Sequence, residues 1–545
     1  MAGLTAGCIV TKMRTFSSYG PVIEKAHFCV KRPLLIQRCV DQLLGAPEEG
    51  GGHFFTIWAP RQTGKTWLVR QAKAKIERDY PGQFIVAEMS MQGVVMEKND
   101  HADLFLRRVP QLFQEAFRLA RGPQPSDWER LKDMFRKDSG LFGKPVILMI
   151  DEFDKLPQGV IDALIGLFRD IYLKRGDHVL HSLALIGVRA VLGVDSPRGS
   201  PFNVQRSLDV PRFDRDEVVE LFRQYQDESG QKIEPEVVEE VWTSTRGQPG
   251  LVCWFGELLT EKYNPDPARK TPIGMKAWQS VHINALFVEP NNTIMNMVAK
   301  ARGEHLPRVL EMFSKSDIPF AIDAEWCNYL FLNGLISFDT ALDGRGGEIR
   351  VCRFTSPFIQ KRIYNALCDD MVGDRMPILA LEPLDRLDDV FEGGRIDCPA
   401  LLKRYTAFLA RLKAKGLNPW RDHPRRADLG LRESVGHFHL YAWAQQALKG
   451  TDMAVTPEFP TGNGKVDLHL HRGAVRAAIE VKSHISGAAL DKSKQQAADY
   501  AVQLGIAEIT LVVFVPTSDP AVIAALSGTS SHGQTTVHTV AIAWE

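Results

Sequence analysis

Short apolar runs alternate with amphipathic stretches over roughly the first half of the chain. Three runs, at residues 54–58 (FFTIW), 145–150 (PVILMI) and about 182–186 (SLALI), are apolar except for Thr56 and Ser182. Such runs are typical of parallel strands that are buried on both faces of a sheet. After the first run, TWLVRQAKAKI has the spacing of an amphipathic helix. The alternation of buried strands with helices predicts an open α/β sheet.

The pattern changes twice further along the chain. Residues 211–300 carry amphipathic helical patterns such as DRDEVVELFRQYQDESG, in which Asp214 or Asp216 can cap the helix. From about residue 305 the sequence predicts two helices, two strands around GRGGE and a closing helix. We interpret this order as a winged-helix unit. A rigid spacer role is favoured over DNA binding, because residues 305–335 carry few basic side chains.

Period-two alternation returns near the C-terminus, in VDLHLH and VRAAIEVK, two strands joined at Arg472 and Gly473. A helix, LRESVGHFHLYAWAQQALKG, precedes this hairpin. A second helix, DKSKQQAADYAVQLG, and a core strand, ITLVVFVP, follow it. The order of elements predicts a second, separate α/β domain.

Composition bounds the function classes. A chain of 545 residues is long enough for three or four domains. Lys plus Arg equals Asp plus Glu at 66 each, so a nucleic-acid partner needs a local basic patch. The eight cysteines lack a CxxC spacing, which favours reduced thiols over a zinc ribbon. No signal segment or membrane-length apolar run is evident, so we expect a cytoplasmic protein with no membrane partner.

The first candidate site is the loop APRQTGKT, between the strand at 54–58 and the helix after it. It follows the P-loop pattern, with Ala59 in place of the first glycine. Backbone N–H groups at a helix start can hold phosphates, Lys65 can neutralise the β- and γ-phosphates, and Thr66 can offer its hydroxyl to Mg²⁺. The predicted ATP contacts of this loop are Arg61, Gln62, Thr63, Gly64, Lys65 and Thr66.

Two carboxylates end the strand at 145–150. Asp151 is predicted to hold Mg²⁺, and Glu152 to polarise the attacking water. By itself this pair would be a helix cap, but a preceding P-loop favours ATP binding. Arg189 ends the next strand, where a γ-phosphate sensor and a plain surface arginine explain it equally well. Gly247-Gln248-Pro249 starts a helix and, taken alone, would be a turn followed by an N1 proline.

From about residue 16 to residue 258 the chain resembles AAA-like ATPase domains of prokaryotic proteins. The likeness rests on SYGPVIEKAHFCVKR, APRQTGKT, ILMIDEFD, LIGVR, SPFN and RGQPGLV. The resemblance implies that HFCVKR forms part of the adenine pocket. It also implies that Pro249 lines this pocket, as in the GxP element of STAND-type relatives. No arginine finger can be read from the sequence, although Arg206 and Arg212 are candidates.

The second candidate site is the C-terminal hairpin. Strand alternation puts Asp467 on one face with His469 and His471, and a turn near Arg472 brings Asp467 close to Glu480 and Lys482. Two carboxylates with a backbone carbonyl and waters suit Mg²⁺ or Mn²⁺. The lysine can orient a water molecule or stabilise a phosphorane. Charged residues on a surface hairpin are the alternative.

The order of helix, hairpin, helix and strand over residues 428–516 resembles the PD-(D/E)xK nuclease superfamily. The resemblance implies Glu433, Asp467, Glu480 and Lys482 as the active site, with Gln496 and Tyr500 beside the nucleic acid. A domain that keeps the fold and only binds is the rival interpretation. We expect His469 and His471 to be exposed strand residues, and His437 and His439 to be packing residues rather than metal ligands.

A basic stretch precedes this domain. The segment KRYTAFLARLKAKGLNPWRDHPRRADLG interleaves basic side chains with Tyr405, Phe408 and Trp420, which would suit a phosphate backbone. A solvated helix face explains the part before Gly416 at least as well. Its basic residues are Lys403, Arg404, Arg411, Lys413, Lys415, Arg421, Arg425 and Arg426.

The sequence thus predicts an α/β protein with five parts. They are an AAA-like ATPase core (1–210), a helical lid (211–300), a winged-helix segment (301–375), a helical linker (376–427) and a nuclease-like domain (428–545). The predicted function is an ATP-regulated, metal-dependent nuclease that uses ATP and Mg²⁺ or Mn²⁺, with DNA as the favoured substrate and RNA left open. A role in defence against phage or plasmids is a hypothesis that follows from the family resemblance.

We expect this protein to form a homo-oligomer, and a partner subunit is left open. Two rival functions come from other classes. One is a STAND-like signalling ATPase whose C-terminal domain only binds nucleic acid. The other is an ATP-driven regulator that binds DNA through the winged helix.

Overall fold

The fold is described from a computed structural model. It describes residues 13–544, except 21, 47, 49, 61, 98, 188–205, 314, 316, 343–346, 373–379, 382–385, 392–394, 421–422, 424–430, 450, 459–466, 474 and 484–486. The chain divides into two compact units. Unit 1 comprises residues 1–289 with 332–334, and unit 2 comprises residues 290–331 with 335–545.

Unit 1 is built around a parallel sheet of five strands in the order β2-β3-β4-β1-β5. Its strands are β1 (Phe54–Trp58), β2 (Ile85–Ser90), β3 (Val146–Asp151), β4 (Leu180–Gly187) and β5 (Arg206–Asp209). β1 lies between β4 and β5, and β3 lies between β2 and β4. β1 and β3 therefore end at the same edge of the sheet, separated by β4.

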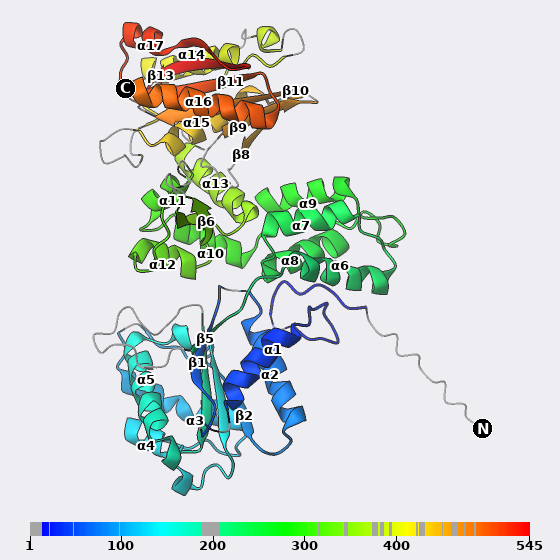
Figure 1. The fold of residues 1–545 in the computed structure, drawn as a ribbon, viewed down its shortest axis with the longest axis vertical. Coiled ribbons are helices and arrows are strands. Elements are labelled where there is room, and N and C mark those ends of the chain that lie inside the picture. The colour runs from blue at the N-terminus through cyan, green and yellow to red at the C-terminus, as the bar shows by residue number, and fades with distance from the viewer. Residues whose placement is uncertain are drawn as a thin grey trace, which may run out of the picture. The chain divides into compact units, whose positions relative to one another are not determined.

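Helices cover both faces of this sheet, as the apolar strands require (Figure 1). On one face, α1 (Pro33–Leu44) and α2 (Lys65–Asp79) pack on Ile57, Ile147 and Ile186. On the other face, the short helix η2 (Ala102–Arg107), α3 (Val109–Phe117), α4 (Trp128–Asp133) and α5 (Gln158–Leu173) pack on Leu148, Ile150 and Leu185. Adjacent residues of one strand thus enter opposite cores, as the pleat demands.

The rest of unit 1 is a helical bundle that follows the sheet. It contains α6 (Arg215–Ser229), α7 (Pro235–Thr245), α8 (Pro249–Glu257), a π-helical turn (Leu258–Lys262) and α9 (Met275–Phe287). Asp214 caps α6: its side chain accepts from the backbone N–H of Glu217, and the Glu217 side chain accepts from the N–H of Asp214. Of the two candidate caps in the sequence, Asp214 is therefore the one used.

Unit 2 begins with helices and a two-stranded sheet. The helices are α10 (Asn292–Ala301), α11 (Leu306–Met312), α12 (Glu325–Leu332) and α13 (Pro357–Val372). Between α12 and α13, β6 (Ile336–Leu342) pairs antiparallel with β7 (Glu348–Phe354). The order of helices, hairpin and closing helix follows the pattern from which we interpreted a winged-helix segment.

The second sheet has six strands in the order β12-β13-β11-β10-β9-β8. They are β8 (Ala454–Glu458), β9 (Asp467–Arg472), β10 (Val475–Ser483), β11 (Glu508–Val515), β12 (Gly528–His532) and β13 (Thr535–Ala543). β10, β11 and β13 run parallel, whereas β8, β9 and β10 form antiparallel pairs. The sheet is therefore mixed.

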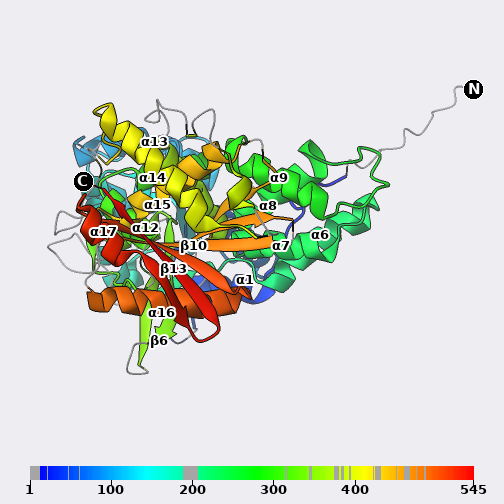
Figure 2. The same ribbon diagram turned by 90° about the horizontal axis from the view of Figure 1, so that it is seen from above.

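Helices flank the second sheet on both sides (Figure 2). α16 (Gly487–Leu504) covers one face, where Ala497, Ala498 and Ala501 pack with Leu511 and Val513. α14 (Cys398–Ala414) and α15 (Glu433–Ala447) lie on the other face, and α17 (Pro520–Leu526) lies beside β13. α14 thus packs with this sheet although it precedes residue 428, where the sequence placed the domain boundary.

The aromatic residues of the basic stretch have a structural role. Tyr405, Phe408 and Trp420 are buried, and the Trp420 ring packs against Phe514 and His439. They are therefore core residues, and the expectation that they interleave with a phosphate backbone is wrong. Arg421, Arg425 and Arg426 lie outside the described residues.

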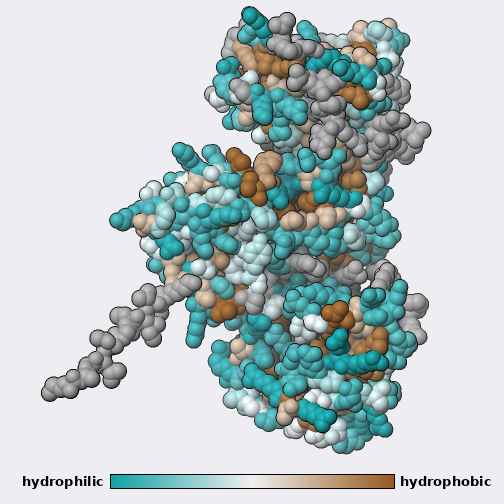
Figure 3. Space-filling model, turned by 180° about the vertical axis from the view of Figure 1, so that it is seen from behind, coloured by the Kyte–Doolittle hydropathy of each residue, from teal (hydrophilic) through white to brown (hydrophobic). Residues whose placement is uncertain are grey.

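Hydrophilic residues predominate among the coloured residues on the face that Figure 3 shows. On the face that Figure 3 shows, hydrophobic residues lie in small separate groups. Among the described residues, no helix combines the length and the apolar character needed to cross a membrane.

Candidate functional site

The P-loop connects β1 to α2 in unit 1, as the sequence predicts. Gly64 precedes α2 with φ 91°, and Gln62 has φ 58°, so the loop uses left-handed conformations on both sides of Thr63. The Thr63 hydroxyl donates to the carbonyl oxygen of Pro60 at 2.8 Å, which closes the turn. A Cβ added at Gly64 would meet no atom within 4 Å, so the space beside the helix start is open.

Lys65 and Thr66, the first two residues of α2, make polar contacts at the sheet edge. The ammonium group of Lys65 donates to the carbonyl oxygens of Ala59 and Pro60, both at 2.8 Å. The Thr66 hydroxyl donates to Oδ2 of Asp151 at 2.8 Å. The structure therefore brings together a hydroxyl and a carboxylate that are 85 residues apart in the sequence. This donor set fits a nucleotide with Mg²⁺.

Glu152 follows Asp151 in an unusual backbone conformation. Its φ of 57° and ψ of 33° are left-handed, which costs a non-glycine residue roughly 1 kcal/mol. Its side chain is half-exposed and forms an ion pair with Lys155 at 3.1 Å. This conformation turns the chain from the end of β3 directly into the 3-10 turn at Phe153–Lys155.

The loop also contacts α8 and the N-terminal segment. The carbonyl oxygen of Gln62 accepts from the N–H of Gly250 at 3.0 Å, beside buried Pro249, and the Gln62 amide donates to the carbonyl oxygen of Ser18 at 3.3 Å. A Cβ at Gly250 would lie 2.6 Å from Cβ of Gln62, so only glycine permits this approach. Pro249 thus lies next to the P-loop, whereas Arg61 and Arg189 lie outside the described residues.

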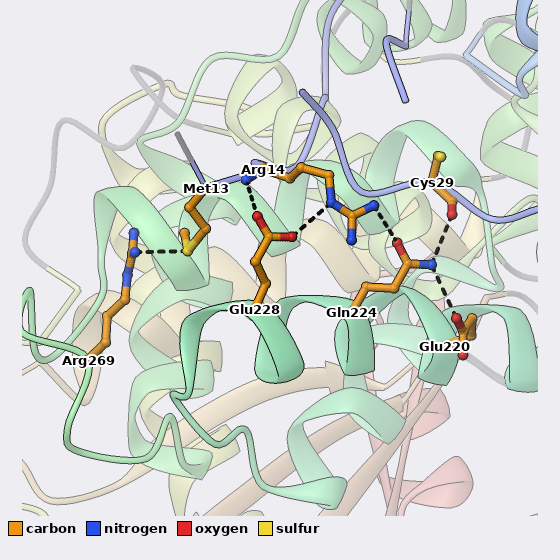
Figure 4. A network of polar contacts seen from close by, with 7 residues as sticks. All are labelled: Met13, Arg14, Cys29, Glu220, Gln224, Glu228 and Arg269. Carbon is orange, nitrogen blue, oxygen red and sulfur yellow. Dashed lines mark hydrogen bonds and ion pairs between the residues drawn. The ribbon is translucent and has the colours of Figure 1, made fainter. Parts of the chain in front are cut away.

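Polar contacts hold the N-terminal segment on α6 (Figure 4). Both the backbone N–H and the guanidinium of Arg14 donate to Glu228, at 2.7 and 2.8 Å. Gln224 donates to the carbonyl oxygen of Cys29 at 3.0 Å. Phe16 packs beneath this network against Phe222, from the same helix. The lead-in to the P-loop is therefore fixed to the helical bundle.

Two contacts of this segment were not foreseen from the sequence. Ser18 donates a short hydrogen bond to Glu257 at the end of α8. Arg32 binds Glu217 of α6 through two hydrogen bonds, at 2.7 and 2.6 Å. The partners are about 185 to 240 residues apart, so no local pattern could have paired them. Both contacts tie the residues before β1 to the helices after β5.

The second site lies in unit 2, where a lysine is held between two carboxylates. The ammonium group of Lys482 is 3.1 Å from Glu433 and 3.3 Å from Glu480. Glu433 begins α15, and Glu480 and Lys482 share one face of β10. The Glu480 side chain is fully buried, and those of Lys482 and Glu433 are 15% and 17% exposed. A buried carboxylate is costly unless it is paired, and Lys482 supplies the opposite charge.

Backbone pairing places two more acidic residues in the same row. Glu480 is the direct partner of Asp467 on β9, and Asp467 is the direct partner of Glu458 on β8. Direct partners in an antiparallel ladder share a face of the sheet. Glu458 was missed in the sequence, where it stands in PEFP without a chemical motif around it. The strand register was the signal that could have found it.

One side chain of α16 contacts the hairpin beside this site. Tyr500 lies 3.2 Å from Nε2 of His469, and Gln496 is exposed one turn earlier. His469 is half-buried, so the expectation of a plainly exposed strand residue is wrong. The row of acidic residues is suited to oxygen-coordinated cations such as Mg²⁺ or Mn²⁺. Among the side chains that the structure describes, which exclude those of Asp467 and Glu458, no three-residue metal group forms.

Two histidines of α15 are packing residues, as expected. Nδ1 of His437 bonds the hydroxyl of Tyr364 at 2.6 Å, and Nδ1 of His439 bonds that of Tyr405 at 2.7 Å. Both pairs are buried, and burial lowers the pKa of His439 to about 3. These bonds attach α15, which carries Glu433, to α13 and α14.

Unit 1 therefore has an α/β P-loop ATPase fold. Its P-loop and Asp151 lie together at one edge of the parallel sheet. Comparisons with solved structures give three examples. The Walker-type ATPase PABY2304 of Pyrococcus abyssi is 15% identical, with a TM-score of 0.43, covering 64% of this chain and 99% of that chain. The ORC1 protein of Aeropyrum pernix in complex with DNA is 15% identical, with a TM-score of 0.32, covering 63% and 93%. The RuvB Holliday junction branch migration motor of Thermotoga maritima is 14% identical, with a TM-score of 0.33, covering 62% and 95%.

One protein-family profile matches the second site. Residues 427–517 match a domain of unknown function, DUF8371, and this range includes Glu433, Glu480 and Lys482. A search of curated proteins gave no match. The function of the second site must therefore be argued from its residues.

Proposed function

We propose that this protein is an ATP-regulated nuclease that hydrolyses phosphodiester bonds with a divalent metal ion. The observation that carries the proposal is the position of Lys482 between Glu433 and Glu480, beside the strand pairing of Glu480 with Asp467. A PD-(D/E)xK nuclease needs this combination of acidic residues and one lysine. DNA is the proposed substrate, and a role in defence against phage or plasmids remains a prediction.

Each residue of the second site has a proposed role. Asp467 and Glu480 hold Mg²⁺ or Mn²⁺, and Glu458 adds a further carboxylate to their row. The ion, when bound, lowers the pKa of a water molecule and neutralises charge on the phosphate. Lys482 orients the water and stabilises the negative charge that develops on phosphorus oxygens. Glu433 holds Lys482 in position, and Gln496 and Tyr500 lie beside the nucleic acid.

The chemical step is a hydrolysis. The water oxygen forms a bond to phosphorus while the bond from phosphorus to the leaving oxygen of the deoxyribose breaks. One proton leaves the water and one reaches the leaving oxygen, so the products are a phosphomonoester and a hydroxyl group. Lys482, as a cation beside the phosphate, is placed to favour the charged transition state over the substrate.

The first site supplies the proposed regulation. Lys65 and the P-loop N–H groups bind the phosphates of ATP, and Thr66 and Asp151 hold Mg²⁺. Glu152 activates water for ATP hydrolysis, with Arg189 as the sensor of the γ-phosphate. Pro249 lines the adenine pocket. We further propose that the protein acts as a homo-oligomer.

The test is a cleavage assay on plasmid, linear duplex and single-stranded DNA, with RNA alongside, in Mg²⁺ or Mn²⁺. Wild type is compared with Glu480→Gln and Lys482→Met, and with Glu508→Gln as a control that removes one carboxylate elsewhere in the same sheet. We expect Glu480→Gln and Lys482→Met to lose at least about a hundredfold in rate, and Glu508→Gln to cut normally.

Cutting that persists in Glu480→Gln would show that another site, or a contaminant, is responsible. If wild type cuts no substrate with any metal, with or without ATP, the nuclease proposal fails. The signalling ATPase with a binding-only domain would then be the better explanation.

A further inference from the structure

Helix α14 concentrates positive charge in a chain that is neutral as a whole. No acidic residue occurs between Cys398 and Trp420, whereas five basic residues do: Lys403, Arg404, Arg411, Lys413 and Lys415. The carboxylate before the helix, that of Asp397, accepts a hydrogen bond from the backbone N–H of Ala400 at 2.8 Å and serves as the N-cap. A neutral protein that binds a polyanion needs such a local excess of basic residues.

The two arginines of this set bind partners within unit 2. Arg404 donates to both carboxylate oxygens of Asp389, at 2.8 and 2.7 Å. Arg411 donates to the carbonyl oxygen of Ala380 at 3.1 Å, and its guanidinium lies 5.8 Å from the centroid of the Phe408 ring. Both guanidinium groups therefore help to hold the helix in the fold. The outward charge of α14 comes from the three lysines, whose side chains are exposed.

The exposed residues of α14 lie on one side of the helix, because they recur at three- and four-residue spacing. They are Lys403, Thr406, Ala407, Ala410, Lys413 and Ala414. Between Lys403 and Lys413 this face holds only small side chains, so a partner can approach both ammonium groups closely. At about 1.5 Å per residue, the two lysines are about 15 Å apart along the helix axis. The major groove of DNA is about 12 Å wide, so these flexible side chains can reach phosphates on both sides of it.

The rest of the helix favours a nucleic acid over a membrane or a protein partner. Within α14, every residue of which the structure describes, no large apolar side chain is exposed. Helices that lie on a membrane bury Trp, Phe or Leu in the lipid, and protein interfaces are enriched in aromatic residues. The aromatic residues of α14, Tyr405 and Phe408, are buried in the core. A phosphate backbone requires only cations on an accessible surface, which this face supplies.

We propose that the outer face of α14 binds the phosphate backbone of duplex DNA through Lys403, Lys413 and Lys415, without regard to base sequence. This contact is separate from the proposed cutting site. Figure 2 shows α14 and α16 on opposite sides of the second sheet, and Glu480 shares a strand face with Ala478, which packs with α16. In a nuclease, the α14 contact holds a second segment of the same DNA and so raises the concentration of substrate near the cutting site.

The experiment measures DNA binding by the full chain without cleavage. Fluorescence anisotropy of a short labelled duplex, in EDTA and at several salt concentrations, gives the Kd and its salt slope with no metal-bridged contact. The double variant Lys403→Gln/Lys413→Gln is compared with Lys403→Arg/Lys413→Arg, which keeps both charges. The control is Lys276→Gln/Lys449→Gln, which removes two exposed lysines outside α14. Thermal melting shows that each variant is folded, and vesicles that contain phosphatidylserine test the membrane alternative.

We expect Lys403→Gln/Lys413→Gln to weaken DNA binding by about 5- to 30-fold and to reduce the salt slope by about two, one phosphate contact for each lysine. The arginine variant and the control should stay within about twofold of wild type, because the charge of the α14 face is kept in both. An equal loss in the control, no DNA binding by wild type, or binding to the vesicles and not to DNA would overturn the inference.

The outcomes separate this inference from the nuclease proposal. If wild type binds DNA through the α14 lysines and cuts nothing in Mg²⁺ or Mn²⁺, the nuclease proposal fails and the α14 contact stands. If wild type cuts DNA and Lys403→Gln/Lys413→Gln binds and cuts like wild type, the α14 contact fails and the nuclease proposal stands.

Discussion

At the scale of single residues, close packing determines which residue type some positions can hold. Gly256 of α8 is an example, because a Cβ there would lie 2.4 Å from the ring of Phe16. Phe16 in turn packs on Phe28 and Phe222. A glycine in the middle of a helix is otherwise unfavourable, so this position serves the N-terminal segment and not the helix.

Gly256→Ala should therefore destabilise unit 1 by about 1–3 kcal/mol, because Phe16 must move out of its place. Gly166→Ala is the matched control. Gly166 lies in α5, where a Cβ would meet no atom within 4 Å, and alanine should stabilise that helix by about 0.5–1 kcal/mol. Urea unfolding measures both changes. A stabilised Gly256→Ala variant would contradict the packing described for Phe16.

His439 makes the stability of unit 2 depend on pH. Burial lowers the pKa of its folded-state imidazole from 6.5 to about 3, so the folded protein keeps it neutral while the unfolded chain binds a proton below 6.5. This contribution is complete above pH 6.5 and is lost as the pH falls from 6.5 toward 3.

The loss should approach 1.4 kcal/mol per pH unit within that window. Denaturant unfolding of wild type and His439→Gln, at intervals between pH 7 and pH 4, measures it as the difference in pH slope. His471→Gln, at an exposed position on β9, is the control. Identical pH slopes for wild type and His439→Gln would show that the imidazole is not buried in its neutral form.

At the scale of elements, contacts at the start of a helix help to fix its position in the fold. α6 begins with a capping box in which Asp214 and Glu217 exchange hydrogen bonds, and Glu217 also binds Arg32 before α1. The same helix holds Arg14 through Glu228. α6 is thus fixed at its start by its own residues and along its length by the N-terminal segment.

Asp214→Ala should destabilise unit 1 by about 0.5–2 kcal/mol, because the backbone N–H of Glu217 loses the Asp214 carboxylate that accepts its hydrogen bond. Asp216→Ala removes the same charge from the first turn without a cap and should change stability by less than about half as much. Thermal or urea unfolding compares the two. A larger loss of stability for Asp216→Ala would show that Asp216, and not Asp214, caps the helix.

At the scale of the whole molecule, the sequence predicts order better than it predicts contacts. The sequence shows the order expected of a P-loop protein: a strand, the GKT loop, a helix and, later, a strand that ends at Asp151. This order allowed us to infer that the loop and Asp151 lie at the same edge of the sheet. The alternation of side chains along the two strands predicted the register of the hairpin, in which Glu480 lies opposite Asp467. These features depend on residues near one another in the chain or on one rule of strand geometry.

The remaining features depend on long-range packing that no local pattern encodes. His439 reaches Tyr405 across 34 residues. Lys482 reaches Glu433 across 49 residues, a pairing that only the family resemblance implied. Tyr405 and Trp420 looked like stacking residues because basic residues surround them in the sequence. They are buried because α14 packs on the sheet, which only the folded chain reveals.

The proposed regulation by ATP also belongs to this scale, because the P-loop lies in unit 1 and Lys482 lies in unit 2. Lys65→Ala should weaken ATP binding by about 10- to 100-fold, since it removes a charged hydrogen-bond donor from the phosphates. ATP should change the cleavage rate of wild type and leave that of Lys65→Ala unaltered.

Titration with a fluorescent ATP analogue and the cleavage assay measure the two effects. Lys73→Ala, on the same helix, is the control and should bind ATP like wild type. Cleavage that responds to ATP equally in wild type and Lys65→Ala would separate the nuclease from the P-loop.

The two tyrosine–histidine pairs of α15 set the smallest fragment in which the second site can be studied. A fragment that starts at residue 428, or at the matched range 427–517, contains His437 and His439 without Tyr364 or Tyr405. It would leave two imidazole nitrogens without their phenol partners and strip a helix from one face of the sheet. Beginning at Pro290, where unit 2 starts, keeps both tyrosines and also Phe313, which packs on Tyr364 and Phe438. Truncation at the boundary of sequence similarity should therefore give an insoluble or misfolded product, and truncation at residue 290 a usable one.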